Sequence, residues 1–303
     1  MIIPLINFAR KRCLGGYSHN VRKASFREFG GTLAAACERT PMIEKHIVTV
    51  KVWGDYACFT RPELKVERMS YPTMTPSAAR GVLDAILFKK KTDAKSGQLT
   101  PAFHWHIRRI TTLQPWWLNG RALSRPEFIS IRRNEVQGKI APRTVAGWIA
   151  EPSTFGPYLV DSAGRDSVGG QNRTQRNTLA LRDVAYLIEA SVQVEDLSES
   201  DSPIKYREMF LRRVARGQCF HRPYLGCREF ACHFTPPDGT EKPLPWTEGL
   251  GLMLYDIRFD PKGQNLPGFF AAVVHNGVLH CDTADQGPAG EPPVQVLGWE
   301  APS

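Results

Sequence analysis

The chain has no hydrophobic run long enough to cross a membrane as a helix. Its longest apolar stretches, Met1–Ala9 and Gly268–Val274, fall well short of the roughly 18 residues that a membrane span needs. Cysteine is also sparse, with seven scattered through 303 residues. An odd number in a chain of this length does not suit a disulfide framework. We therefore expect a cytoplasmic protein with no membrane partner.

Motifs for nucleotide cofactors and for common hydrolases are missing as well. The sequence holds no Walker loop, no G-x-S-x-G elbow and no dinucleotide fingerprint. Two groups of side chains contain residue types that could bind a metal, but neither has a common zinc spacing. Such residues are more often buried cysteines or part of a polar sheet face. These groups are His104 with His106, and Cys219, His221, Cys227, Cys232 and His233. We predict no metal and no cofactor.

Positive charge is unevenly distributed along the chain. The whole sequence carries 39 Lys and Arg against 30 Asp and Glu, a net charge of +9. Residues 1–41 hold seven of the basic and two of the acidic residues, so +5 belongs to this prefix and +4 to the remaining 262 residues. The prefix resembles an organelle transit peptide in composition, and a disordered basic arm or a start codon misassigned upstream of Met42 would look the same. We predict that residues 1–41 are an extension outside the folded protein.

Hydrophobic periodicity predicts several strands and two helices after Met42. Thr75-Pro76 and Ser202-Pro203 each join a capping side chain to a proline suited to the first helical turn, and apolar residues follow at helical spacing. Asn276-Gly277 is a strong two-residue hairpin turn. The expected strands are 46–59, 103–113, 128–136, 178–194, 224–234, 252–259, 269–275 and 278–281.

The order of these elements predicts an α+β fold. We expect a ferredoxin-like core, as in RNA-recognition domains, with an antiparallel sheet appended at the C-terminus. The core domain would span residues 42–234, and the appended β region with its tail would span 235–303. Residues 138–176 are rich in Gly, Pro, Ser and Arg and lack a clear period. We predict a long loop there, serving either as an RNA clamp or as a subunit contact.

Two arginine pairs lie inside apolar, alternating segments. Arg108-Arg109 and Arg132-Arg133 each place one side chain on either face of a strand. Charged residues on strands are commonly a solvated face, but aromatic residues lie close by in sequence, among them Trp105 and Phe128. Arginines for phosphates and aromatic rings for base stacking are combined on the sheets of single-stranded RNA binders. This pattern favours an RNA partner.

Four long stretches carry a resemblance to a known family. They are VKVWGDYACFTRPELKVERMSYPTMTPSAARGVLDAI at 50–86, FHWHIRRITTLQP at 103–115, FISIRRNEV at 128–136 and KYREMFLRRVARGQCFHRPYLGCREF at 205–230. They resemble the Cas5 family of type I-C CRISPR effector complexes. The resemblance implies a RAMP-type fold and a prokaryotic, cytoplasmic endoribonuclease that cuts precursor CRISPR RNA (crRNA) and stays on the 5′ handle of the mature guide. It also implies partners: the backbone, large and small subunits of the complex, and target DNA through them.

The resemblance further implies metal-independent cleavage, in which a 2′-hydroxyl attacks the neighbouring phosphate and leaves a cyclic phosphate. The family's catalytic Lys-His pair matches Lys205 and Tyr206 here, and its first-helix tyrosine (or histidine) matches Leu87. Lys205 can supply a cation and Tyr206 can assist proton transfer, whereas leucine can do neither. The expected RNA-binding residues are Arg132, Arg133, Arg108, Lys89, Lys90 and Arg212. The departures keep open a non-catalytic scaffold that caps the crRNA 5′ end, and a generic single-stranded RNA-binding module is a third interpretation.

Overall fold

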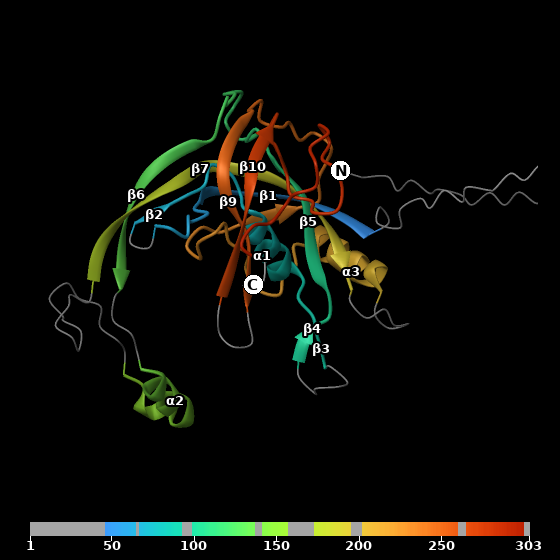
Figure 1. The fold of residues 1–303 in the computed structure, drawn as a ribbon. Helices are drawn as coiled ribbons and strands as arrows, with labels where there is room; N and C mark the ends of the chain where they lie inside the picture. The colour runs from blue at the N-terminus through green and yellow to red at the C-terminus, as the bar shows by residue number, and fades with distance from the viewer. Residues whose placement is uncertain are drawn as a thin grey trace, which may run out of the picture. The chain divides into compact units, whose positions relative to one another are not determined.

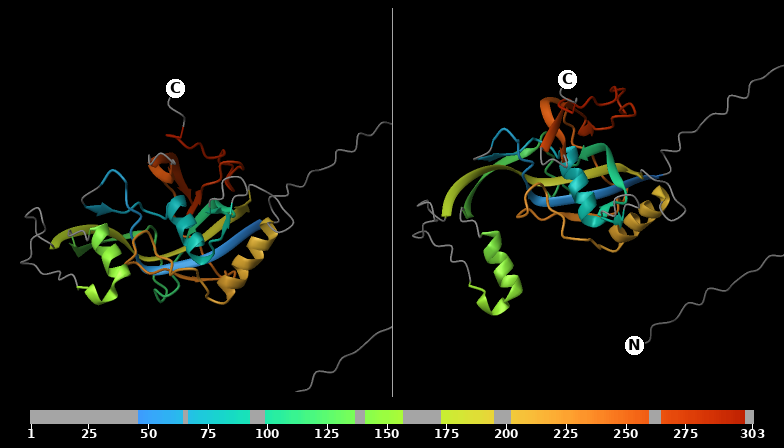
Figure 2. Two further views of the ribbon diagram at one scale, coloured as in Figure 1. Left: turned by 90° about the horizontal axis from the view of Figure 1, so that it is seen from below. Right: turned by 60° about the horizontal axis from the view of Figure 1, so that its bottom comes forward.

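A curled, largely antiparallel sheet dominates the fold (Figure 1). The computed structural model describes residues 46–64, 67–92, 99–136, 141–156, 173–194, 202–259 and 265–299. Within these residues nine strands form the sheet, and helices α1 (Pro76–Ile86) and α3 (Pro203–Ala215) pack against it (Figure 2). No helix in this part of the chain is long and apolar enough to cross a membrane. The predicted extension 1–41 lies outside the described residues.

Strand β7 organises the sheet, because β1, β2, β5 and β6 all pair with it. The strands are β1 (Ile47–Ala57), β2 (Arg68–Met69), β5 (His104–Thr112), β6 (Glu127–Val136), β7 (Arg173–Gln193), β8 (His233–Thr235), β9 (Glu248–Phe259), β10 (Asn265–His275) and β11 (Val278–His280). The order is β8-β1-β7-β5-β11-β10-β9. The C-terminal strands therefore extend the same sheet through the β11–β5 pair. β3 (Lys90–Thr92) and β4 (Leu99–Pro101) form a separate two-stranded ribbon.

Both predicted helix starts are confirmed. Thr75 Oγ1 accepts a hydrogen bond from the backbone N–H of Ala78 at 3.2 Å, and Ser202 Oγ accepts one from the backbone N–H of Lys205 at 3.3 Å. Each cap satisfies a backbone donor that the first helical turn leaves without a partner. Proline then occupies the first helical turn in both helices.

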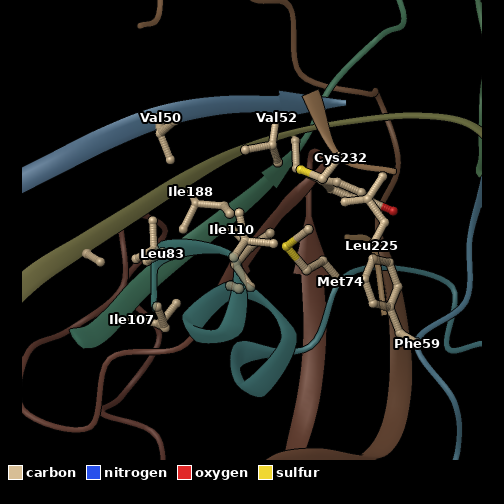
Figure 3. Close-up of a cluster of buried hydrophobic side chains, with 14 of the residues drawn as sticks. Val50, Val52, Phe59, Met74, Leu83, Ile107, Ile110, Ile188, Leu225 and Cys232 are labelled. Atoms are coloured by element: carbon tan, nitrogen blue, oxygen red, sulfur yellow. The ribbon is translucent and has the colours of Figure 1, made fainter. Parts of the chain in front are cut away.

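The core lies between the sheet and helix α1. Alternation along β1 buries Val48, Val50 and Val52 almost completely. Figure 3 shows Val50, Ile110 of β5, Ile188 of β7 and Leu83 of α1 converging in this layer. Full burial of each such side chain is worth about 1.5–3 kcal/mol. The strands predicted at 46–59, 103–113 and 178–194 are confirmed, because their alternation reports burial on one face.

The strand predicted at 224–234 is wrong. Only His233–Thr235 joins the sheet as β8, and the preceding residues form turns against the last residues of β1. Gly226 has φ +82°, and a Cβ there would lie 2.1 Å from the carbonyl oxygen of Cys58. The backbone N–H of Cys58 donates to the carbonyl of Leu225 at 3.1 Å. The apparent alternation came from side chains buried under successive turns. We call residues 221–231 the strap.

The loop predicted at 138–176 is wrong in part. Helix α2 occupies Pro142–Ala150, a 3₁₀ turn follows at Pro152–Thr154, and β7 begins at Arg173. The helix has proline in its first turn, but Ala141 offers no capping side chain, so one of the two start signals is missing. The first residues of β7 are polar and are held by pairing with β6, which hydrophobic alternation cannot reveal. Residues 157–172 lie outside the described part.

Candidate nucleic-acid interface

The two predicted catalytic residues, Lys205 and Tyr206, are neighbours near the start of α3, but their side chains lie in different surroundings. Lys205 is exposed, and its Nζ lies 5.2 Å from the centre of the Tyr206 ring. Tyr206 is 3% exposed and stacks on Phe103, with ring centroids 4.5 Å apart. Together with Phe210 and Val214, Tyr206 forms the buried stripe of the helix. The lysine is therefore accessible to a phosphate, whereas the tyrosine ring belongs to the core.

Leu87 ends helix α1 and offers no polar group from its side chain. It is 0% exposed, and its backbone N–H donates to the carbonyl of Leu83 at 2.9 Å. A buried leucine can neither donate nor accept a proton. The position matched to a family tyrosine is therefore filled by a packing residue.

Lys89 and Lys90 lie close to the start of α3. Both are exposed, and the carbonyl of Lys89 accepts a hydrogen bond from the backbone N–H of Ala102 at 2.9 Å. Ala102 precedes Phe103, the residue on which Tyr206 stacks. The structure thus brings Lys89, Lys90 and Lys205 into one neighbourhood, which the sequence had placed far apart.

Arg132 and Arg133 belong to a second, separate neighbourhood. In the sheet Arg132 lies opposite Asn177 of β7, whereas His104, next to Phe103, lies opposite Gln193 at the other end of that strand. Asn177 and Gln193 are 16 residues apart along β7, which corresponds to roughly 50 Å of extended chain. The predicted RNA contacts therefore form two groups. Only a strand of RNA several nucleotides long would reach both.

The two β6 arginines differ in their surroundings. Arg132 is exposed, and within the described residues it forms no ion pair. Arg133 is paired with Glu229 of the strap, and its side chain is 15% exposed. This ion pair weighs against the RNA contact predicted at Arg133, because its charge is already compensated within the protein. Arg212, in the last turn of α3, is exposed.

Arg108, also predicted to contact RNA, is paired with carboxylates of its own chain. Its Nε lies 3.1 Å from Asp282 Oδ2, and its Nη2 lies 2.9 Å from Asp285 Oδ2. The Arg108 side chain is only 17% exposed. Burial opposes ionisation of Asp282, but hydrogen bonds from His106 and two backbone amides outweigh it and hold the pKa of Asp282 below its usual value. Arg108 therefore stabilises the join between β5 and the C-terminal segment.

The residues considered for a metal do not come together. Cys227 and Cys232 are buried and Cys219 is exposed, while His106 Nε2 lies 2.9 Å from Asp282 Oδ1. Among the described residues no three His, Cys, Asp or Glu side chains gather as metal ligands. Cys227 contacts Cys58 instead, and hydrogen bonding from the Cys58 thiol, with the nearby guanidinium of Arg68, lowers the pKa of Cys227 to about 6.

A pocket of about 480 Å³ opens along the strap. Its lining residues are His221, Arg222, Pro223, Tyr224, Arg228, Glu229 and Ala231. Glu229 is paired with both Arg68 and Arg133, so its negative charge is compensated from outside the pocket. The two lining arginines then leave the pocket positively charged. It suits an anionic ligand such as a phosphate.

Sequence reasoning missed this pocket. In the sequence, most of its residues fall within a predicted strand, and His221 is considered only as a member of a possible zinc cluster. The usable signal was Pro223 and Gly226, two turn-forming residues flanking basic and aromatic side chains.

Comparison with known proteins supplies the family. A model of the family described as CRISPR-associated protein (Cas_Cas5) matches residues 47–282. A "CRISPR pre-crRNA endoribonuclease Cas5d" of Mannheimia succiniciproducens is 40% identical over 241 residues, covering 77% of this chain and 93% of the relative. A protein of the same name from Thermus thermophilus is 38% identical over 247 residues, covering 76% of this chain and 89% of the relative.

A solved structure titled "Crystal Structure of CRISPR-associated Protein" is similar at 19% identity with a TM-score of 0.48, covering 82% of this chain and 96% of the other. The family match covers most of the described residues, including β1, both predicted helices, the strap and β11. This chain belongs to the Cas5 family of CRISPR-associated proteins.

Proposed function

We propose that this protein is an endoribonuclease that cuts precursor crRNA within the repeat. The observation that carries the proposal is the 40% identity to a relative named for this activity, across 93% of that relative. Exposed basic side chains on β6, on α3 and after α1 suit an RNA ligand. The protein would then remain on the crRNA 5′ handle as a cytoplasmic subunit of a type I-C complex with backbone, large and small subunits, and meet target DNA through them.

The fold proposal is a ferredoxin-like RAMP core. The strands β1, β5, β7 and β8 occur in the sheet order β8-β1-β7-β5, with α1 between β1 and β5 and α3 between β7 and β8. All three neighbouring pairs are antiparallel. Two interleaved βαβ units produce this order, which supports the proposal. Residues 42–234 would form this domain, and 235–303 the appended β region.

The proposed chemistry is metal-independent. A 2′-hydroxyl attacks the adjacent phosphate, the new O2′–P bond forms as the P–O5′ bond breaks, and the products are a 2′,3′-cyclic phosphate and a 5′-hydroxyl. Such a reaction needs a cation near the phosphate, a proton acceptor and a proton donor. Lys205, exposed in the first turn of α3, supports the role of the cation, since amides at a helix start also favour a phosphate. The burial of Tyr206 favours packing over proton transfer.

The proposed RNA contacts are the exposed members of the predicted set. They are Arg132, Arg212, Lys89 and Lys90, together with Lys205. Because they form two neighbourhoods along β7, we propose that RNA passes both, with sequence-independent contacts to its phosphates. Arg108 and Arg133 are left out because their charges are compensated within the protein.

A non-catalytic scaffold that caps the crRNA 5′ end is the second candidate. Leu87 and the buried Tyr206 favour it, because both positions matched to family catalytic residues lack an accessible proton-transfer group. The scaffold interpretation predicts tight RNA binding without cleavage.

Cleavage of the cognate repeat RNA in EDTA separates the two candidates. We expect one cut that leaves a cyclic phosphate, and no cut when the attacking 2′-hydroxyl is replaced by hydrogen. Lys205→Ala should weaken binding and slow cleavage, whereas Lys242→Ala, at an exposed lysine outside both neighbourhoods, should change neither. Binding of intact repeat RNA without any cut would refute the enzyme and support the scaffold.

A further inference from the structure

His221 is fixed at the end of helix α1, although it follows α3 in sequence. The backbone N–H groups of Phe220 and His221 both donate to the carbonyl of Ala85, at 2.8 and 3.1 Å. Ala85 lies two residues before Leu87. The strap therefore carries an exposed imidazole to the same helix end at which Leu87 has no proton-transfer group.

The surroundings of the His221 ring select one tautomer. Nδ1 lies 3.4 Å from the carbonyl oxygen of Arg222. A carbonyl oxygen can only accept, so this contact favours the tautomer that carries the hydrogen on Nδ1. In that tautomer the lone pair lies on Nε2, which is the form that a general base requires.

The pocket beside His221 has the features that a phosphate and its base would need. Arg222 and Arg228 line it, and within the described residues neither forms an ion pair. Phe220, next to His221, is 62% exposed and 6.2 Å from the Phe88 ring, centroid to centroid. Phe220 is not among the residues that line the pocket, but its ring lies 5.8 Å from the His221 ring, centroid to centroid, and an exposed aromatic ring next to the base suits the stacking of a single-stranded nucleotide.

Charged groups face His221 from two elements. From α1, Asp84 lies near enough to interact with it, and Arg80 lies near Asp84. From the strap itself, Arg222, Arg228 and the compensated Glu229 share its pocket. Burial raises the pKa of Asp84 to about 6, so at higher pH a carboxylate stands beside the ring. A carboxylate there would stabilise the imidazolium that forms when the ring takes up a proton.

We propose that His221 is the general base of the cleavage reaction and that the strap pocket holds the scissile nucleotide. The inference rests on the proposed endoribonuclease function and names its proton acceptor. The proton of the 2′-hydroxyl moves to Nε2 of His221 as the O2′–P bond forms. The P–O5′ bond breaks, and the leaving 5′ oxygen takes a proton from water, after which His221 returns its proton to solvent. Arg222 and Arg228, which line the pocket, face the phosphate.

The test compares cleavage by the full chain with that by His221→Asn and His221→Gln, using repeat RNA in EDTA. Loss of a general base should slow cleavage by about 10²–10⁴-fold, while RNA affinity stays within about threefold. Wild-type cleavage should fall on the acid side, because a protonated base cannot act, and that fall should be weaker in both variants. Adding imidazole to His221→Ala should restore part of the rate. His275→Asn, at a histidine on β10, is the matched control and should cleave normally.

Each outcome decides the question. Wild-type cleavage with unchanged rate and pH profile in His221→Asn and His221→Gln would overturn the inference and leave the proposed function intact. A slow variant that imidazole does not rescue, and that retains the wild-type pH profile, would show a structural role and also overturn it. Absence of cleavage by the wild-type chain, with RNA bound, would refute the proposed function and the inference together.

Discussion

Replacing Gly226 by alanine tests the packing that forms the strap. Gly226 has φ +82°, and an added Cβ would lie 2.1 Å from the carbonyl oxygen and 2.7 Å from the carbonyl carbon of Cys58. Both atoms belong to backbone, so rotation of a side chain cannot relieve the overlap. The strap itself would have to move away from the end of β1.

Two contributions make up the stability that Gly226→Ala should lose. The left-handed backbone conformation costs an alanine roughly 1 kcal/mol. Displacement of the strap breaks the hydrogen bond between the N–H of Cys58 and the carbonyl of Leu225, and a buried group left without its partner costs about 1–3 kcal/mol. We expect Gly226→Ala to lower the free energy of unfolding by about 3 kcal/mol, or Tm by roughly 10 °C.

Gly239 provides a matched control for the backbone part alone. It has the same φ of +82°, but apart from its chain neighbours no atom of the described residues lies within 4 Å of the Cβ position. Gly239→Ala should therefore cost only about 1 kcal/mol. Urea or thermal unfolding of both variants separates the steric contribution from the conformational one. Equal losses in the two variants would refute the close approach of strap and β1.

The remaining predictions concern charge, packing and RNA contacts. Because burial raises the pKa of Asp84 from 3.8 to about 6, ionising it costs stability, which is lost as pH rises from about 4 through 6. Asp84→Asn should abolish this pH-dependent decrease in the free energy of unfolding, which amounts to about 3 kcal/mol. Unfolding of both proteins at pH 4 and pH 8 measures the decrease. Tyr206→Phe should keep the cleavage rate within about twofold if the ring only packs, and a large loss would restore the proton-transfer role. Arg132→Ala should reduce the slope of log affinity against log salt by about 0.7. Arg108→Ala should destabilise the fold and leave that slope unchanged, as filter binding at several salt concentrations would show.

Local signals predicted the elements that depend on neighbours in sequence. The caps of α1 and α3, the alternation of β1 and the Asn276-Gly277 turn each act within a few residues. The first half of β7 and the turns of the strap depend on partners far along the chain. A hydrophobic pattern reports burial, and it does not report whether a strand or a series of turns produces that burial.

The candidate site shows the same division. The sequence pointed to basic residues in strands, and Arg132 is exposed as that interpretation requires. Arg108 and Arg133 lie in the same pattern, but carboxylates from Asp282, Asp285 and Glu229 hold them. Those acids are distant in sequence, so only the folded structure reveals the pairing.

The charge available to RNA is therefore decided by what each arginine faces. Glu229 forms ion pairs with Arg68 and Arg133. Arg222 and Arg228 form no ion pair in the described part of the chain. An uncompensated arginine in a concave site gains more from a phosphate than one already paired, because it gives up no existing partner. The net charge of the protein counts all of these residues alike. Among the residues that line the pocket on the strap, Glu229 is the acid, and Arg68 and Arg133 neutralise it from outside, which suits the pocket to the phosphate of the proposed RNA ligand.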